Sequence, residues 1–320
     1  MGRTMMGNMA ARMTTFRRLA VASTAATFLL VGIGGLVRAT KSGLGCGTSW
    51  PHCPGDVTRA LVIELSHRTV AGIVILLLGM LVVVAYRNRH DHPGLLHAAS
   101  VAFGLVLGQA LLGAIVVWLE LEAESVVLHL ATAMALLALL VHITARALVL
   151  EGKLHASSDR GISRSASWAA GSVLVLLLVG SYVTGRDAGY VFPDWPLMNG
   201  GLVPDLSVDV HAIHFAHRAL AGIVGVVVFV VGARTIRRRK EFPLQAKLSH
   251  IAVGAYAVEV LIGALNVWTR LNSASVTLHL AVGAVVWASL VGVAVVSRPE
   301  LATDVSTRSL RSATALEQGA

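Results

Sequence analysis

The sequence predicts an all-α polytopic membrane protein, with eight transmembrane helices arranged as two four-helix bundles related by a pseudo-two-fold axis. Three observations predict this fold. The chain of 320 residues is 55% hydrophobic and 13% charged, with a mean hydropathy of +0.73, whereas about a quarter of the residues of a soluble domain are charged. Its apolar residues gather in runs long enough to cross a bilayer. Several short motifs also recur at an offset of 150 residues.

Eight apolar runs are candidates for membrane-spanning helices. They lie near 18–37, 66–86, 95–118, 125–149, 167–185, 212–233, 247–268 and 275–296. At a rise of about 1.5 Å per residue, each crosses most or all of a hydrocarbon layer about 30 Å thick. The first run could instead be a signal peptide that follows Arg17 and Arg18. Its length suits a span, however, and the internal repeat requires it.

Lysine and arginine predict the orientation of these spans. The N-terminus, the second, fourth and sixth connections and the C-terminal tail together hold 19 of the 26 basic residues. The positive-inside rule therefore places both termini in the cytoplasm of a bacterial cell, with the protein in its cytoplasmic membrane. The net charge of +9 reflects these flanks. No basic domain lies outside the membrane to bind nucleic acid.

Three pairs of segments align at the offset of 150 residues. They are ELSHRTVAGIV (64–74) with HFAHRALAGIV (214–224), LLGAIVVW (111–118) with LIGALNVW (261–268), and SVVLHLATA (125–133) with SVTLHLAVG (275–283). A unit of four helices returns the chain to its starting side, so both halves should share one topology about an axis along the membrane normal. The expected organisation is a cytoplasmic tail at 1–16, an N-terminal half at 17–150, a cytoplasmic linker at 151–166, a C-terminal half at 167–297 and a cytoplasmic tail at 298–320.

Each half repeats two histidines at similar depth near the outer face of the membrane. They are His67 and His129 in the first half, and His217 and His279 in the second. Two facing neutral imidazoles can ligate one metal from opposite sides, and this suits a planar cofactor bound on both axial faces, namely haem. A single intramembrane histidine is often a packing residue. Four at two repeated positions favour ligation, because polar residues inside membranes usually mark function.

Charged residues accompany the first histidine of each pair. Arg68 and Arg218 directly follow it, and they could either snorkel to the interface or pair with haem propionates. Glu64 lies one helical turn before His67, whereas the equivalent residue of the second half is His214. This asymmetry suggests that the first half performs chemistry and the second holds a fixed cofactor. The alternative is an ordinary acidic residue near a helix N-terminus.

The only two cysteines, Cys46 and Cys53, lie in the first outer loop. The outer face is oxidising, which favours a disulfide, either structural or redox-active. A free dithiol and a metal site with His52 are the alternatives, although the spacing matches no zinc template well.

In combination, these motifs resemble the haem A synthase family over roughly residues 17–296. The resemblance implies that His217 and His279 are the axial ligands of a haem b iron, and that His67 and His129 are axial to the substrate, haem O. It implies that Glu64 is catalytic and that Cys46 and Cys53 are the family's cysteine pair. The reaction oxidises a methyl group of haem O to a formyl group, by two hydroxylations and loss of water, to make haem A for aa3-type cytochrome oxidase.

The same resemblance implies partners. They are a haem O synthase that supplies the substrate, an electron donor of unknown identity, the lipid bilayer and a second copy of the chain in a homo-oligomer.

Two other functions fit part of the pattern. A di-haem electron carrier linked to quinol would use the four histidines equally well, but it would not require Glu64 or the cysteine pair. A histidine-lined metal transporter would favour midplane sites and broken helices, whereas these histidines lie near one face. Glu259, which Gln109 matches in the first half, is either functional or a hydrogen-bonded packing residue.

Overall fold

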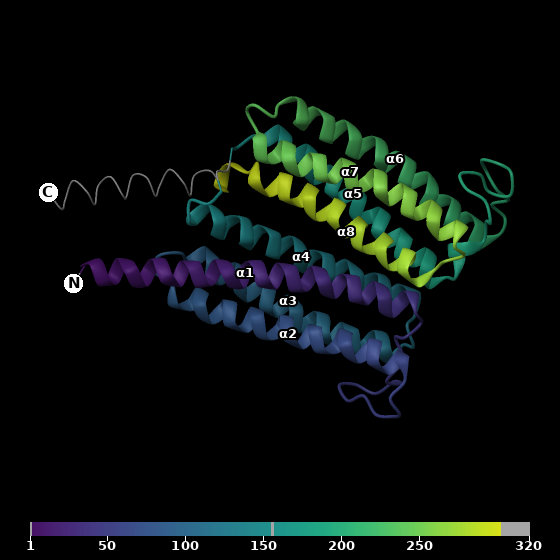
Figure 1. Ribbon diagram of the computed structural model, residues 1–320, viewed down its shortest axis with the longest axis horizontal. Coiled ribbons are helices and arrows are strands. Elements are labelled where there is room, and N and C mark those ends of the chain that lie inside the picture. Colours follow the sequence, from purple (N-terminus) through teal and green to yellow (C-terminus); the bar gives the residue numbers. More distant parts are fainter. Residues whose placement is uncertain (1, 155–156, 302–320) are drawn as a thin grey trace.

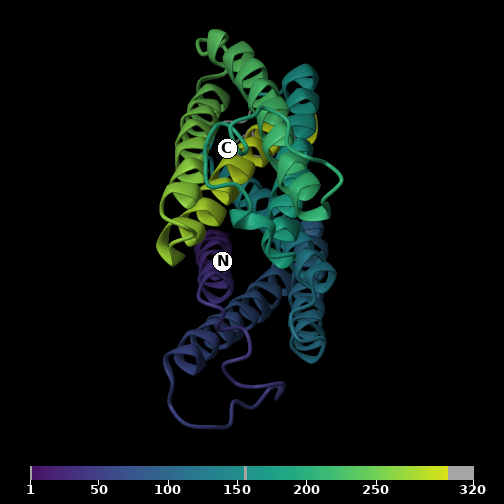
Figure 2. The ribbon, with the colours of Figure 1, turned by 90° about the vertical axis from the view of Figure 1, so that its right-hand side faces the viewer.

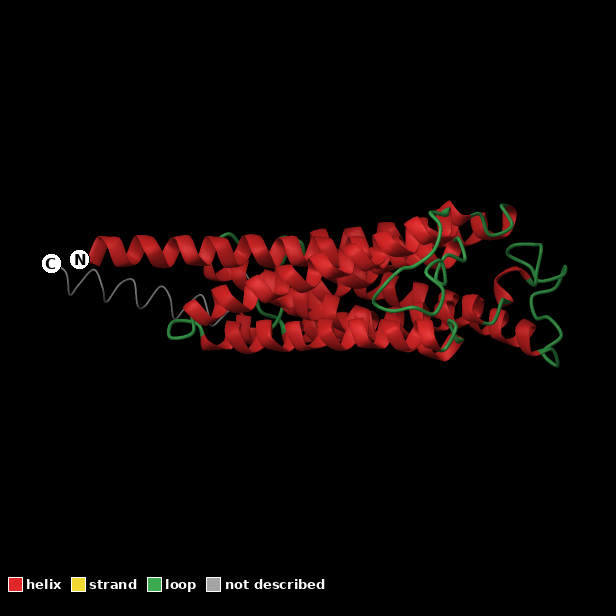
Figure 3. Cartoon of the chain, turned by 90° about the horizontal axis from the view of Figure 1, so that it is seen from below, coloured by secondary structure: helices red, strands yellow, loops and turns green. Residues whose placement is uncertain are grey.

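The computed structural model describes residues 2–154 and 157–301, and its regular structure there is helical. Within these residues, eight helices are long and apolar enough to cross a membrane, which confirms the predicted all-α polytopic class. They are α1 (Gly2–Ala39), α2 (Arg59–Arg87), α3 (Pro93–Trp118), α4 (Ala123–Leu150), α5 (Arg160–Gly185), α6 (Asp209–Arg237), α7 (Pro243–Trp268) and α8 (Ser273–Val296). A short 3₁₀ helix, η1 (Ala188–Tyr190), follows α5. Figure 3 shows the helices running lengthwise with the loops gathered at their ends.

The helices extend beyond the apolar runs that predicted them. The N-terminal tail expected at 1–16 is helical from Gly2, and α5 begins at Arg160, inside the linker expected at 151–166. Hydropathy marks the part of a helix that suits hydrocarbon, whereas backbone hydrogen bonds continue into polar sequence. The side chain of Asp159 caps α5 by accepting a hydrogen bond from the Ile162 amide at 2.8 Å. Of the expected C-terminal tail, residues 302–320 lie outside the described residues.

Each half forms a ring of four helices. In the first half α1 packs on α2, α2 on α3, α3 on α4, and α4 on α1, and α5 to α8 repeat this order. Figure 1 shows the two long loops, residues 40–58 and 186–208, at the end opposite the N-terminus, which we call the outer end. Figure 2 looks onto that end, with the first half below the second. The pseudo-two-fold axis and the cytoplasmic location of the termini stay predictions.

The two halves meet along four helices. The packed pairs between them are α1 with α8, α4 with α5, and α4 with α8. Helix α8 is the most buried of the spans, and it packs on α1 and α4 of the first half as well as on α5 and α7 of its own half. Val31, Met134 and Leu137 of the first half share one apolar cluster with residues of the second, including Trp287 and Leu290 of α8.

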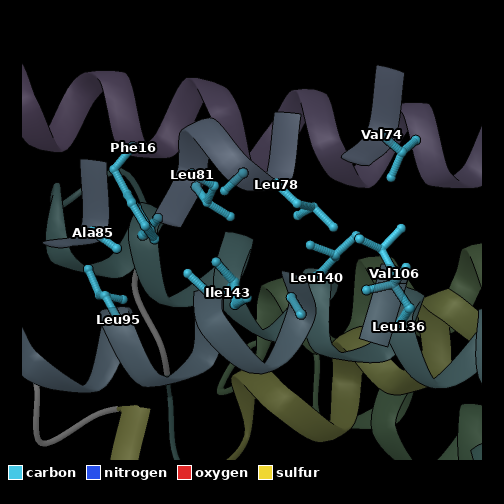
Figure 4. Packing of buried hydrophobic residues seen from close by; sticks show 14 of the residues in the cluster. Phe16, Val74, Leu78, Leu81, Ala85, Leu95, Val106, Leu136, Leu140 and Ile143 are labelled. Carbon is cyan, nitrogen blue, oxygen red and sulfur yellow. The ribbon is translucent and has the colours of Figure 1, made fainter. Parts of the chain in front are cut away.

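The core of the first half lies away from the outer end. Figure 4 shows aliphatic side chains from α2, α3 and α4 packed along the bundle, with Phe16 of α1 at one end of the row. On the two helices that carry the histidines, the residues of this cluster nearest the outer end are Val74 on α2 and Leu136 on α4. His67 and His129 each lie seven residues, about two turns, beyond them toward the outer end (74 − 67 and 136 − 129). The histidines therefore stand beyond the apolar core of their bundle.

Candidate functional site

A glycine of the adjacent helix lies against each of the four repeated histidines. The pairs are Gly34 with His67, Gly113 with His129, Gly180 with His217 and Gly263 with His279. A Cβ atom added to these glycines would lie 3.3, 3.3, 3.0 and 3.3 Å from the Cε1 atom of the ring. In every case an odd-numbered helix supplies the glycine and the next helix supplies the histidine. The absent side chain lets the imidazole lie flush against its neighbour.

The four rings share a second property. Each is partly exposed, yet its Nδ1 atom is buried and has no hydrogen-bond partner among the described residues. Buried polar groups normally have hydrogen-bond partners, so four unpaired Nδ1 atoms at equivalent positions indicate a common function for the four histidines. With Nδ1 enclosed and Cε1 against a glycine, Nε2 is the nitrogen left open to a ligand.

The rings of His217 and His279 lie next to each other in the second half, with the edge of one directed at the other. Their centroids are 6.5 Å apart and their planes cross at 80°. Bonds from a metal to an imidazole nitrogen are about 2 Å long, so two rings that share one metal have nitrogens about 4 Å apart. The observed separation therefore leaves room for an iron atom between the two rings. The residues present fit a haem bound through two axial imidazoles.

The first half has a looser arrangement. His67 and His129 lie close enough to interact electrostatically. Among the described residues, however, a ring contact joins His217 to His279 and none joins His67 to His129. The two pairs are thus equivalent in position but not in spacing.

Glu64 is buried and joins the first outer loop to α2. One carboxylate oxygen accepts a hydrogen bond from the Cys46 amide at 2.8 Å, and the other is paired with the Arg68 guanidinium. Arg68 also donates to the backbone carbonyls of Ser49 and His52, both at 3.0 Å. Glu64 is therefore held by two contacts one turn from His67.

His214 takes the same place in the second half. Its Nδ1 lies 2.6 Å from the carbonyl oxygen of Ala188, and its Nε2 accepts a hydrogen bond from Arg218 at 2.8 Å. The first contact requires a proton on Nδ1 and the second requires an unprotonated Nε2, so together they specify the neutral Nδ1–H tautomer. Arg218 further donates to the carbonyls of Asp194 and Leu197 in the second outer loop. Both arginines thus bind loop backbone, a role that neither sequence interpretation foresaw, and the propionate contact stays a prediction.

The outer loops are anchored alike. Trp50 packs edge-on against Trp118 with centroids 6.5 Å apart, and Trp195 packs in the same way on Trp268 at 6.0 Å. In the first loop Cys46 and Cys53 form a disulfide. The bridge confirms the favoured prediction over a free dithiol or a metal site, because neither thiolate is free to bind a metal.

A family model described as cytochrome oxidase assembly protein, COX15-CtaA, matches residues 17–61 and 57–291. The chain belongs to this family.

Curated relatives agree with the family. A haem A synthase from Geobacillus thermodenitrificans is 29% identical over 255 residues, which cover 77% of this chain and 79% of the relative. Haem A synthases of two Staphylococcus aureus strains, bovine RF122 / ET3-1 and Newman, are each 27% identical over 263 residues. Those matches cover 79% of this chain and 85% of each relative. The matched part of this family member contains all four repeated histidines.

Three features of this family member were not predicted from its sequence. The glycine contacts join residues of different helices, although Gly113 and Gly263 lie inside an aligned motif. The bridging role of His214 could be inferred only from its alignment with Glu64. The sequence allowed either a functional or a packing role for Glu259 but did not predict its neighbour: its Oε1 atom lies 3.2 Å from Nδ1 of His279.

Proposed function

We propose that this chain is a haem A synthase of a bacterial cytoplasmic membrane, which oxidises a methyl group of haem O to a formyl group. The observation that carries the proposal is the pair of equivalent imidazole sites, one in each half of a chain of this family. One site suits a cofactor that stays and the other a haem that enters and leaves. The curated relatives, which are named haem A synthases, support the same reaction.

The second half would hold a haem b through His217 and His279. Their ring centroids already lie 6.5 Å apart, and α8, which carries His279, is packed on both halves. When bound, this haem would supply electron transfer. The chain's part is to fix the two imidazoles by the contacts with Gly180 and Gly263, so that little ordering is needed on binding.

The first half would bind haem O through His67 and His129. The looser spacing of this pair suits a substrate that must be exchanged. Gly34 and Gly113 orient the two rings, and the apolar core that ends near Val74 lies two turns away. The outer loop, held by the disulfide and by Arg68, would limit the access of water to the reacting methyl group.

Glu64 is the acid–base candidate in this half. Both of its carboxylate oxygens are engaged, one by the Cys46 amide and one by Arg68. Each carboxylate oxygen keeps a second lone pair, at which Glu64 would exchange a proton with both contacts in place. Arg68 would have to leave its present partners to reach a propionate, and Arg218 would have to do the same in the second half. A haem O synthase would supply the substrate, and an electron donor and a second copy of this chain are the other expected partners.

The experiment compares wild-type protein with His67→Ala and His217→Ala in cells that make haem O but have no haem A synthase of their own. Haems are extracted from the membranes and from the purified proteins and separated by chromatography. We expect haem A and haem b with the wild type. His67→Ala should keep haem b but make no haem A, and His217→Ala should lose most of the tightly bound haem b. Wild-type protein that carries haem b in cells without haem A would indicate an electron carrier instead.

A further inference from the structure

Helix α7 carries an acidic side chain next to a candidate haem ligand. Oε1 of Glu259 lies 3.2 Å from Nδ1 of His279, and the Glu259 side chain is 13% exposed. The two atoms do not have hydrogen-bond geometry here, and Oε2 is buried without a partner among the described residues. An intramembrane carboxyl group without other partners is costly to retain unless it has a function.

The first half uses the equivalent position differently. Gln109 donates a hydrogen bond to the backbone carbonyl of His129 at 2.8 Å and accepts one from the Thr132 hydroxyl. It therefore holds the backbone and the Thr132 hydroxyl of α4 rather than the imidazole. The residue that aligns with Thr132 is Val282, which has no hydroxyl group. The second half has thus lost the competing partner at this position.

A second substitution makes room for the carboxyl group. Gly283 aligns with Ala133, and a Cβ atom on Gly283 would lie only 3.0 Å from Oε1 of Glu259. The other polar group nearby, the Tyr256 hydroxyl, donates to the carbonyl of Ala221. Three differences between the halves therefore leave a carboxyl group directed at His279. They are Glu259 in place of Gln109, Val282 in place of Thr132 and Gly283 in place of Ala133.

We propose that Glu259 is a positioning residue that accepts a hydrogen bond from the Nδ1–H group of His279 and so strengthens Nε2 as a donor to the haem iron of the second half. The proposal rests on the proposed function, because it requires a haem on His217 and His279. A histidine that binds a metal usually donates its other N–H to a carboxylate or a carbonyl, which fixes the ring and raises its basicity. A stronger axial donor stabilises the oxidised iron and lowers the reduction potential.

This contact would set the second half apart from the first. Among the described residues, Nδ1 of His67, His129 and His217 has no comparable acceptor. A haem bound in the second half would then be tuned through one of its two axial ligands. Its lower reduction potential would favour the passage of electrons onward rather than their retention.

The test is a redox titration, followed by optical spectroscopy, of purified wild-type protein, Glu259→Gln and Gln109→Leu. The Gln109→Leu variant is the matched control, since it alters the equivalent position of the first half. We expect all three to keep the second-half haem with its bis-imidazole spectrum. The reduction potential should rise in Glu259→Gln and should not move in Gln109→Leu. Equal potentials in wild type and Glu259→Gln would overturn the proposal.

Two further results separate this proposal from the proposed function. If wild-type protein has no haem that depends on His217, the proposed function fails and this inference fails with it. If Glu259→Gln loses its haem, the variant Gly283→Ala tests the proposal instead. Its added methyl group displaces the carboxyl group of Glu259 without removing it. The other close neighbour of that methyl group is the flexible end of the Leu177 side chain. A raised potential in Gly283→Ala supports the proposal, and an unchanged one overturns it.

Discussion

Glu64 and His214 are different residues that occupy one structural position. Each joins an outer loop to the arginine four residues later on its own helix, as a carboxylate in the first half and as a neutral imidazole in the second. The structural part of the role can therefore be met without an acid. What the first half adds is a carboxylate close to His67, and this difference is chemical rather than architectural.

The variant Glu64→Gln tests that difference. It keeps the size of the side chain and an oxygen acceptor but loses the acid. We expect haem A production to fall by roughly a hundredfold, the lower end of what a positioned acid–base group contributes. Haem O or a hydroxylated product should accumulate, and the second-half haem should stay bound. The assay is haem extraction from cells that supply haem O.

Glu64→His is the control that the chain itself offers, because it installs the residue of the second half. We expect it to keep the loop in place and still to lose haem A production. Full activity in either variant would show that the carboxylate only anchors the loop.

At the scale of elements, the repeated unit is a pair of neighbouring helices. An odd-numbered helix supplies a glycine and the next helix supplies a histidine. The long loops, α1–α2 and α5–α6, are each anchored by a pair of tryptophans. The ring orientation therefore depends on a contact between two helices. A methyl group at the glycine would push the imidazole away from its neighbour.

Gly180→Ala and Gly171→Ala form a matched pair on α5. The added Cβ would lie 3.0 Å from Cε1 of His217 in the first variant and would meet no atom within 4 Å in the second. Both changes should favour the helix slightly. We expect Gly180→Ala to weaken haem b retention by about tenfold, because the ligand loses its supported orientation. Haem loss after purification measures this, and equal retention in both variants would contradict it.

At the scale of the whole molecule, Asp159 ties the linker to the second half. Its carboxylate pairs with Arg238 at 2.8 Å, and its backbone amide donates to the carbonyl oxygen of Ser297 at 3.0 Å. The start of α5 is thereby joined to the ends of α6 and α8. The hydrogen bond from the Ile162 amide and the contact with Arg238 hold the pKa of Asp159 below its ordinary value. A lowered pKa means that this stabilisation is present above the ordinary aspartate pKa and is lost as the pH falls through the lowered one.

Asp159→Ala should reduce the free energy of unfolding by about 1 kcal/mol at neutral pH, the usual value of a helix N-cap. Asp159→Asn keeps the cap oxygen and should lose less. Thermal unfolding in detergent at several pH values measures both effects. The difference between wild type and Asp159→Ala should shrink in acid, and a difference independent of pH would show that the charge is not involved.

The fold was predictable because a single sequence shows both the length of the apolar runs and the motifs repeated between its halves. The ends of helices such as α1 and α5 were not, because polar turns remain helical outside the hydrocarbon. The histidines stood out as repeated polar residues in apolar runs. The contacts of Gly34 and Gly180 and the approach of Glu259 to His279 depend on which faces meet, and apolar runs alone do not specify that.

The joint between the halves has a consequence for how such a chain can arise. When each helix is exchanged for its repeat partner, the pair α1 with α8 becomes α5 with α4, and α4 with α8 maps onto itself. All three pairs are present, as they would be in a dimer of two identical four-helix chains. Two identical subunits, however, would have to hold both of their haems equally tightly. Duplication within a single gene removes that constraint, because the two four-helix halves can then diverge in sequence. One half can keep its haem while the other evolves to release it.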